Sequence, residues 1–154
     1  MIRRLITGVI ALAMLLSLMP FAAPPASAST SGVLISEFRF RGPSGGNDEY
    51  VELTNTSAAA VDISGWKLQG CSSTTGVASD RATVAAGVVI PAGAHFLFTN
   101  SAAVGGYSGT VPGDATYSVG FTDGAGARLL APGSVVVDGV SGTLTALPFS
   151  FAMV

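Results

Sequence analysis

EYVELTNTSAAAVDISGWKL, residues 49–68, is the stretch that decides the fold. Apolar and polar residues alternate in its first part, so that Val51 and Leu53 share one face, as an antiparallel strand with one buried face requires. The polar run NTS then favours a turn, because short polar side chains hydrogen-bond to nearby backbone. A second strand is predicted at 60–63, followed by a Ser-Gly turn and an extended segment at 66–68. The stretch predicts β-structure and identifies no reaction.

The rest of the chain consists of short strands separated by Gly- and Pro-rich turns. Further strands are predicted at 33–40, 82–90, 94–99, 115–120, 128–131 and 134–138. The run Pro91-Ala92-Gly93 predicts a hairpin between the second and third of these, and Asp138-Gly139 predicts another turn. Turn signals recur about every 8–12 residues and no helical period appears after the leader, which indicates an all-β sandwich.

Strand alternation also predicts the core. In 33–40, a strict period of two places Leu34, Ser36, Phe38 and Phe40 on one side, and the two phenylalanines mark it as the buried side. The predicted core residues are Phe38, Phe40, Val51, Leu53, Ile63, Trp66, Leu68, Phe96 and Phe98.

Residues 1–28 have the pattern of a signal peptide. Arg3 and Arg4 are followed by an almost wholly apolar run at 5–19, and Ala26-Ser27-Ala28 fits the small-x-small cleavage rule. An uncleaved membrane anchor is the alternative, but the run is short against the roughly 20 residues that span a bilayer. We therefore expect cleavage after Ala28, a secreted product, and no transmembrane segment in the mature chain.

After cleavage, a short lead-in at 29–32 would precede one domain at 33–140. Nine acidic residues then face five basic ones, with no basic run, so a nucleic-acid partner is not expected. Cys71 is the only cysteine, which rules out an intrachain disulfide, and we expect a structural role for its thiol. Lys67 and the single histidine, His95, are expected on outward strand faces.

The residues capable of chemistry are few. His95 could act as a general base for a nucleophilic serine, but no serine lies in a nucleophile-elbow motif. One histidine and one cysteine are too few ligands for a zinc site. The carboxylates of Glu37, Asp48, Glu49 and Glu52 are best explained as solvated charges. Two alternatives stay open for them.

Those carboxylates would have to gather in a cleft for a hydrolase. For calcium, Asn47, Asp48 and Glu49 offer oxygen ligands in a Gly-rich loop, although six or more ligands are needed. They are weak calcium candidates, and the sequence predicts no catalytic residue, metal site or cofactor. Three aromatic residues, Tyr107, Tyr117 and Phe121, are expected in the core, with a contact strip for a partner as the alternative.

Four stretches together resemble the lamin tail domain, an immunoglobulin-like sandwich that also occurs in exported bacterial proteins. They are LISEF at 34–38, EYVELTN at 49–55, VDISGWKL at 61–68 and VIPAGAHFLFTN at 89–100. Residues 119–140 look like the late strands of that family. The last segment, SGTLTALPFSFAMV at 141–154, does not match its closing strand, so the C-terminal segment is divergent or truncated.

The resemblance implies a fold and an accessory, non-catalytic role, with no catalytic residue set. We therefore expect a secreted binding or structural module at the cell surface or in the medium, whose partner is an extracellular protein or a surface polymer. The alternative is a calcium-dependent binding module or hydrolase that uses Glu37, Asp48, Glu49 and Glu52. A further possibility is pairing with another chain through an exposed sheet edge.

Overall fold

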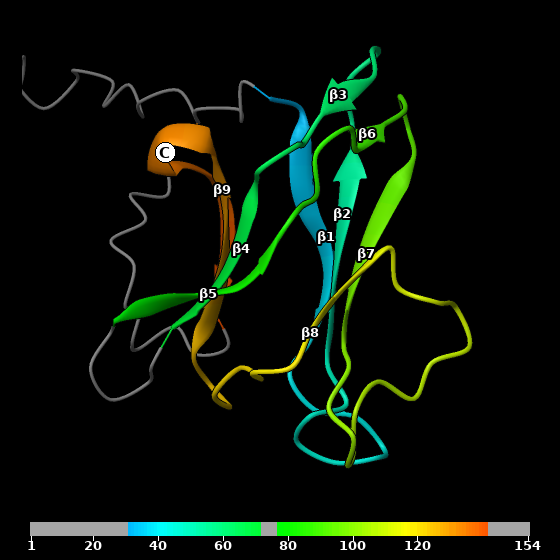
Figure 1. Ribbon diagram of the computed structural model, residues 1–154, viewed down its shortest axis with the longest axis vertical. Coiled ribbons are helices and arrows are strands. Elements are labelled where there is room, and N and C mark those ends of the chain that lie inside the picture. The colour runs from blue at the N-terminus through cyan, green and yellow to red at the C-terminus, as the bar shows by residue number, and fades with distance from the viewer. Residues whose placement is uncertain (1–30, 72–76, 142–154) are drawn as a thin grey trace, which may run out of the picture.

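The computed structural model describes residues 31–71 and 77–141, and these form a sandwich of two β-sheets (Figure 1). The predicted signal peptide and residues 142–154 of the C-terminal segment lie outside the described residues. Within the described ranges, no helix is long and apolar enough to cross a membrane. The predicted all-β, immunoglobulin-like sandwich is confirmed, since one three-residue 3-10 turn, Pro132–Ser134, is the whole helical content of this part.

Each main sheet has four strands. The first sheet has the order β1-β2-β7-β8, with β7 and β8 parallel and the other pairs antiparallel. The second has the order β10-β9-β4-β5 and is antiparallel throughout. Their bounds are β1 Val33–Arg39, β2 Tyr50–Asn55, β7 His95–Asn100 and β8 Ala115–Tyr117, then β4 Lys67–Cys71, β5 Ala78–Thr83, β9 Gly126–Ala131 and β10 Val135–Ser141. Two short strands, β3 Val61–Asp62 and β6 Val89–Ile90, pair at one end.

The core lies between the inner faces of the two sheets. Seven of the nine predicted core residues are buried, and Phe98, Leu53, Ile63 and Leu68 are among the largest fully buried side chains. Phe38 and Phe40 are half-buried and pack against this core. Cys71 is buried as well, and burial raises the pKa of its thiol, in keeping with the expected structural role.

A β-bulge in β1 corrects the predicted face of that strand. Ile35 lies opposite Leu53, yet Glu37 lies opposite Glu52, so Ser36 is an extra residue in the strand. The insertion reverses the alternation at this point, so that Val33 and Ile35 face the core before the bulge and Phe38 faces it afterwards. A strict period of two was therefore wrong for the first half of this strand.

The predicted hairpin around residues 91–93 is also wrong. Its turn forms, with Ala94 N–H donating to Pro91 O at 3.1 Å and φ of Gly93 at +70°. However, the segment before the turn is divided between β5 and β6, and β6 pairs with β3 while β7 pairs with β2. The turn therefore connects β6, which pairs with β3, to β7, which pairs with β2, and the two strands beside the turn do not pair with each other. Asp138-Gly139 is likewise no turn, because both residues lie within β10.

The edge strands of the two sheets meet in pairs. β1 lies beside β10, and the Ile35 N–H donates to Asp138 Oδ2 at 2.8 Å across this boundary. This bond joins two bulges, since β10 has its own irregularity between Val136 and Asp138. On the other side β5 lies beside β8. The last described strand, β10, ends at Ser141.

Asn55 fastens one end of the sandwich. It ends β2 with its side chain fully buried, and its Nδ2 donates to the carbonyls of Ala59, Ile90 and Pro91 at 2.8 to 3.1 Å. Its Oδ1 accepts from the backbone and the hydroxyl of Ser57. One amide therefore holds the loop after β2 against the end of β6.

Asn55→Ala is expected to lower the free energy of unfolding by about 3 kcal/mol, because it leaves several buried polar groups without a partner. The control is Asn47→Ala, which removes one exposed hydrogen bond to Val104 O and should cost less than about 1 kcal/mol. Urea unfolding followed by tryptophan fluorescence measures both. Equal losses would contradict the role given to Asn55.

Candidate functional site: a cleft on the outer face of the first sheet

A cleft of about 350 Å³ lies on the outer face of the first sheet, under the loop 101–114 that connects β7 to β8. Strand alternation turns polar and tyrosine side chains of β1 and β2 to this face. The lining residues are Glu37, Arg39, Tyr50, Glu52 and Leu97 from the sheet, and Tyr107, Gly109, Thr110 and Val111 from the loop.

The loop is fixed to the sheet at its end. Asp114 N–H donates to Leu97 O at 2.8 Å, and Leu97 N–H donates to Asp114 Oδ2 at 2.8 Å. Nearer its start, Tyr107 N–H donates to Asn100 O at 2.9 Å. Beneath the loop, the side chain of Leu97 points to the outer side of β7 and is buried. The cleft therefore has the buried Leu97 within a largely polar floor, and its wall is a loop hydrogen-bonded to the sheet.

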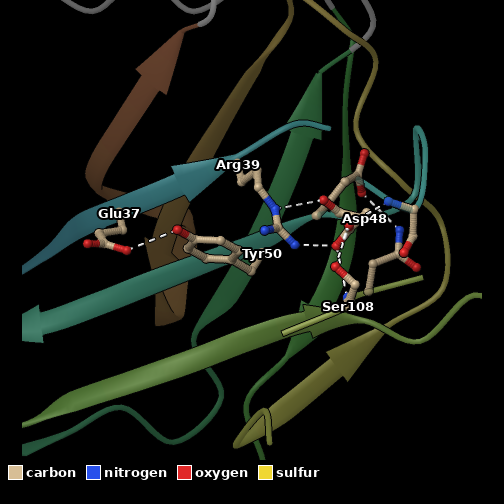
Figure 2. A network of polar contacts seen from close by, with 8 residues as sticks. Glu37, Arg39, Asp48, Tyr50 and Ser108 are labelled. Carbon is tan, nitrogen blue, oxygen red and sulfur yellow. Dashed lines mark hydrogen bonds and ion pairs between the residues drawn. The ribbon is translucent and has the colours of Figure 1, made fainter. Parts of the chain in front are cut away.

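Asp48 holds the middle of the loop. The carboxylate is fully buried and receives hydrogen bonds from Ser108 N at 2.9 Å, Ser108 Oγ at 2.6 Å and Ser44 N at 3.0 Å. Arg39 completes the set through an ion pair from Nη2 to Oδ1 and a bond of 2.9 Å from Nε to Asp48 O (Figure 2). The carboxylate thus joins β1, the loop before β2 and the loop over the cleft.

These partners fix the ionisation of Asp48. Burial alone would raise the pKa of this carboxyl, but the hydrogen bonds from Ser108 and Ser44 and the charge of Arg39 outweigh it and lower the pKa to about 2. Asp48 is therefore ionised throughout the range in which proteins normally work, and the ion pair with Arg39 persists.

Arg39 also contacts two aromatic rings of the cleft. Its guanidinium carbon lies 4.9 Å from the ring centre of Tyr50 and 5.6 Å from that of Tyr107, within the range of cation–π attraction. The two rings meet edge to face with their centres 5.9 Å apart. The positive charge of Arg39 thus interacts with the carboxylate of Asp48 and with the faces of these two rings.

Two glutamates face each other in the same cleft. Glu37 on β1 and Glu52 on β2 are direct cross-strand partners. The Tyr50 hydroxyl donates to Glu37 Oε2 at 3.0 Å. Burial, and to a smaller extent this hydrogen bond, raises the pKa of Tyr50. Glu52 Oε1 accepts from Ser36 Oγ at 2.8 Å and lies 2.9 Å from His95 Nδ1. His95 is exposed, as predicted.

Glu49 lies elsewhere, inside the end of the sandwich. It is fully buried, with Asn100 Nδ2 donating to Oε2 and Phe121 N–H donating to Oε1, both at 2.9 Å. Burial raises the pKa of Glu49, and these bonds, with the charge of Arg81, offset only part of the rise. An added Cβ at Gly120 would lie 3.0 Å from both carboxylate oxygens, so a larger residue there would push against the carboxylate of Glu49.

The four predicted carboxylates are therefore not one site. Glu37 and Glu52 line the cleft, whereas Asp48 and Glu49 are buried, which corrects their interpretation as solvated charges. Of the calcium candidates, Asn47 uses its amide to donate to Val104 O, and the oxygens of Asp48 and Glu49 are occupied by the donors described above. A calcium ion would have to displace these bonds.

The aromatic residues separate in the same way. Tyr117 and Phe121 are buried in the core, as expected, while Tyr107 is half-buried and lines the cleft. Lys67 is exposed as predicted and pairs with Asp80 at 2.7 Å.

Sequence reasoning missed Arg39 and Ser108. Only the alternation of β1 pointed to the first, and nothing local distinguishes Ser108 from Ser101, the other serine of its loop.

Asp48→Asn is expected to lower the free energy of unfolding at pH 7 by about 3 kcal/mol, because the buried amide turns an N–H toward the donors that bond Asp48 and leaves the half-buried Arg39 without its partner. Since the folded-state pKa is depressed, Asp48 stabilises the fold above its ordinary pKa, and this contribution is lost as the pH falls from about 4 toward 2. Denaturant unfolding across this range should show a steeper loss for the unchanged protein than for the variant.

The matched control is Asp123→Asn, which removes an exposed pairing with Arg41. It should cost less than about 1 kcal/mol. Parallel pH dependence in the unchanged protein and the Asp48 variant would contradict the assignment.

Comparison with known proteins agrees with this architecture. No curated protein matches the chain. The family model of the Lamin Tail Domain matches residues 26–143, which include every described strand and the loop over the cleft. This match covers more than half of the chain and extends the resemblance seen in the first strands through β10. The chain therefore belongs to the lamin tail domain family, whose members are non-catalytic, immunoglobulin-like modules.

Proposed function

We propose that this protein is an exported, non-catalytic module that binds an extracellular protein or a surface polymer through the cleft on its first sheet. The family supplies a binding or structural module of immunoglobulin-like fold. The leader pattern of residues 1–28 supports export, and the acidic surface argues against nucleic acid as the partner.

The observation that carries the proposal is the way the loop 101–114 is fastened over the outer sheet face. A buried carboxylate, Asp48, is committed to holding this loop, and Asp114 holds its end. The result is a preformed concavity with rigid walls. A site of this kind loses little conformational freedom when a partner enters, which favours binding.

The buried carboxylates support a role in binding over the hydrolase alternative. Asp48 and Glu49 are buried in the fold and do not line the cleft, so they are not placed to act with Glu37 and Glu52 on one substrate. The groups that do reach the cleft are two glutamates, two tyrosines and an arginine already paired with Asp48. Such groups recognise a partner by charge and by hydrogen bonding.

Thr110→Trp tests the cleft by blocking it. Thr110 is exposed and lines the cleft, whereas Thr83 is exposed on β5 of the other sheet and provides the matched control Thr83→Trp. The purified chain and both variants are immobilised and exposed to envelope and medium fractions of the producing cells. A component retained by the unchanged chain and the Thr83 variant, but lost from the Thr110 variant, is the expected result. Retention by all three would contradict binding through the cleft.

Export has a test of its own. Expression of the full chain in its producing cells should yield a product in the medium or at the cell surface that begins at Ser29, because the small-x-small pattern ends at Ala28. Intact-mass measurement of the purified product determines its first residue. A product that keeps Met1 and stays in the cytoplasm would contradict this part of the proposal.

A further inference from the structure

We propose that the cleft takes a basic side chain, lysine or arginine, from a peptide segment of the partner. This inference rests on the proposed binding function and specifies the chemistry of what is bound. Four properties of the cleft lead to it: its charge, the pairing of its two glutamates, their unused hydrogen-bond acceptors, and the occupation of its tyrosine rings.

The cleft has an excess of negative charge. Its ionisable lining consists of Glu37, Glu52 and Arg39, with two tyrosines. Because Arg39 forms an ion pair with the buried, ionised Asp48, its positive charge is compensated from inside the fold. The charges of Glu37 and Glu52 are then the uncompensated charges of the lining, with His95, outside the lining, 2.9 Å from Glu52 Oε1. An anionic ligand would meet net repulsion, and a cationic one would be attracted.

The two glutamates are placed where they oppose folding. Like charges directly across an antiparallel pair are destabilising, and Glu37 and Glu52 are direct partners at the bulge of β1. The lining residue beside them, Arg39, is turned to Asp48, and His95 contacts Glu52 at 2.9 Å without a contact to Glu37 among the described ion pairs. A fold keeps such an arrangement at a site of function, and a cation bound between the carboxylates removes the repulsion.

The glutamates also retain acceptor capacity. An ionised carboxylate accepts about four hydrogen bonds. Within the described residues, Glu37 accepts from Tyr50 through Oε2, and Glu52 accepts through Oε1 alone. One oxygen of each carboxylate thus remains for the N–H groups of a ligand.

The tyrosine rings decide against a sugar. Sugars are held by stacking on an open aromatic face, but the guanidinium of Arg39 lies over both Tyr50 and Tyr107, and the two rings also contact each other. This internal arginine further shows that a guanidinium fits beside these rings. A basic side chain from a partner meets the carboxylates at its charged end and Leu97 and Val111 along its stem.

The test uses the peptide Ac-Gly-Arg-Gly-Arg-Gly-NH₂ and an otherwise identical peptide with citrulline in place of arginine, which keeps the shape and removes the charge. The full chain is expressed with its leader and purified in the form that the cells produce. Isothermal titration calorimetry at low salt should show binding of the arginine peptide and at least about tenfold weaker binding of the citrulline peptide.

Variants locate the interaction. The double variant Glu37→Gln/Glu52→Gln keeps the shape of both side chains and should weaken binding of the arginine peptide at least about tenfold. The control Asp62→Asn/Asp123→Asn removes the same charge from exposed positions outside the cleft and should change binding less than about twofold. If both double variants weakened binding equally, the effect would depend only on the net charge of the protein and not on the cleft, and the proposal would be overturned.

A readout without ligand complements the titration. Thr110→Lys brings a cation to the cleft from its own wall, so it should raise the melting temperature above that of the control Thr83→Lys and weaken peptide binding. A lower melting temperature than the control, or no binding by the unchanged chain, would overturn the proposal. A partner lost with Thr110→Trp but retained by the glutamine variant would leave the binding function standing and refute the basic ligand alone.

Discussion

The buried carboxylate of Asp48 is the constraint on which the outer half of this molecule depends. It lies at the end of the loop that leads into β2, and the donors around it come from β1, from that loop and from the loop after β7. Burying a charge is expensive unless it is paired and fully hydrogen-bonded, so these segments must come together for the fold to form. The cleft is a consequence of this requirement, since its wall is the loop that Asp48 holds.

The sequence predicted the sandwich well because its strands carry a local signal. Val51, Leu53, Phe96 and Phe98 alternate with polar residues, and such alternation is enough to identify the inner face of β2 and β7. The alternation failed in β1, where Ser36 is inserted as a bulge. A bulge depends on how the neighbouring strand pairs, which the strand's own residues do not reveal.

The candidate site was less accessible to sequence reasoning. The sequence names Glu37 and Glu52 among four candidate carboxylates, and these two meet in the cleft. The sequence predicts Asp48 and Glu49 to be solvated, because a single carboxylate gives no local sign of burial. Their burial depends on donors about 50 to 70 residues away in sequence, Ser108, Asn100 and Phe121. Only the folded arrangement brings such partners together, so the loop could not be assigned its role.

The hydrogen bond between the Ile35 N–H and Asp138 Oδ2 bears on how this protein meets copies of itself. At the bulge, β1 would otherwise present a backbone donor along the margin of its sheet, where a strand of another molecule can attach. Here a side chain from β10 takes that donor, and the two bulges distort the strands next to it. Because this contact occupies the free backbone donor of β1, a strand of another molecule cannot pair there. The domain has one cysteine and therefore no intrachain disulfide, and this contact protects it against aggregation at this margin.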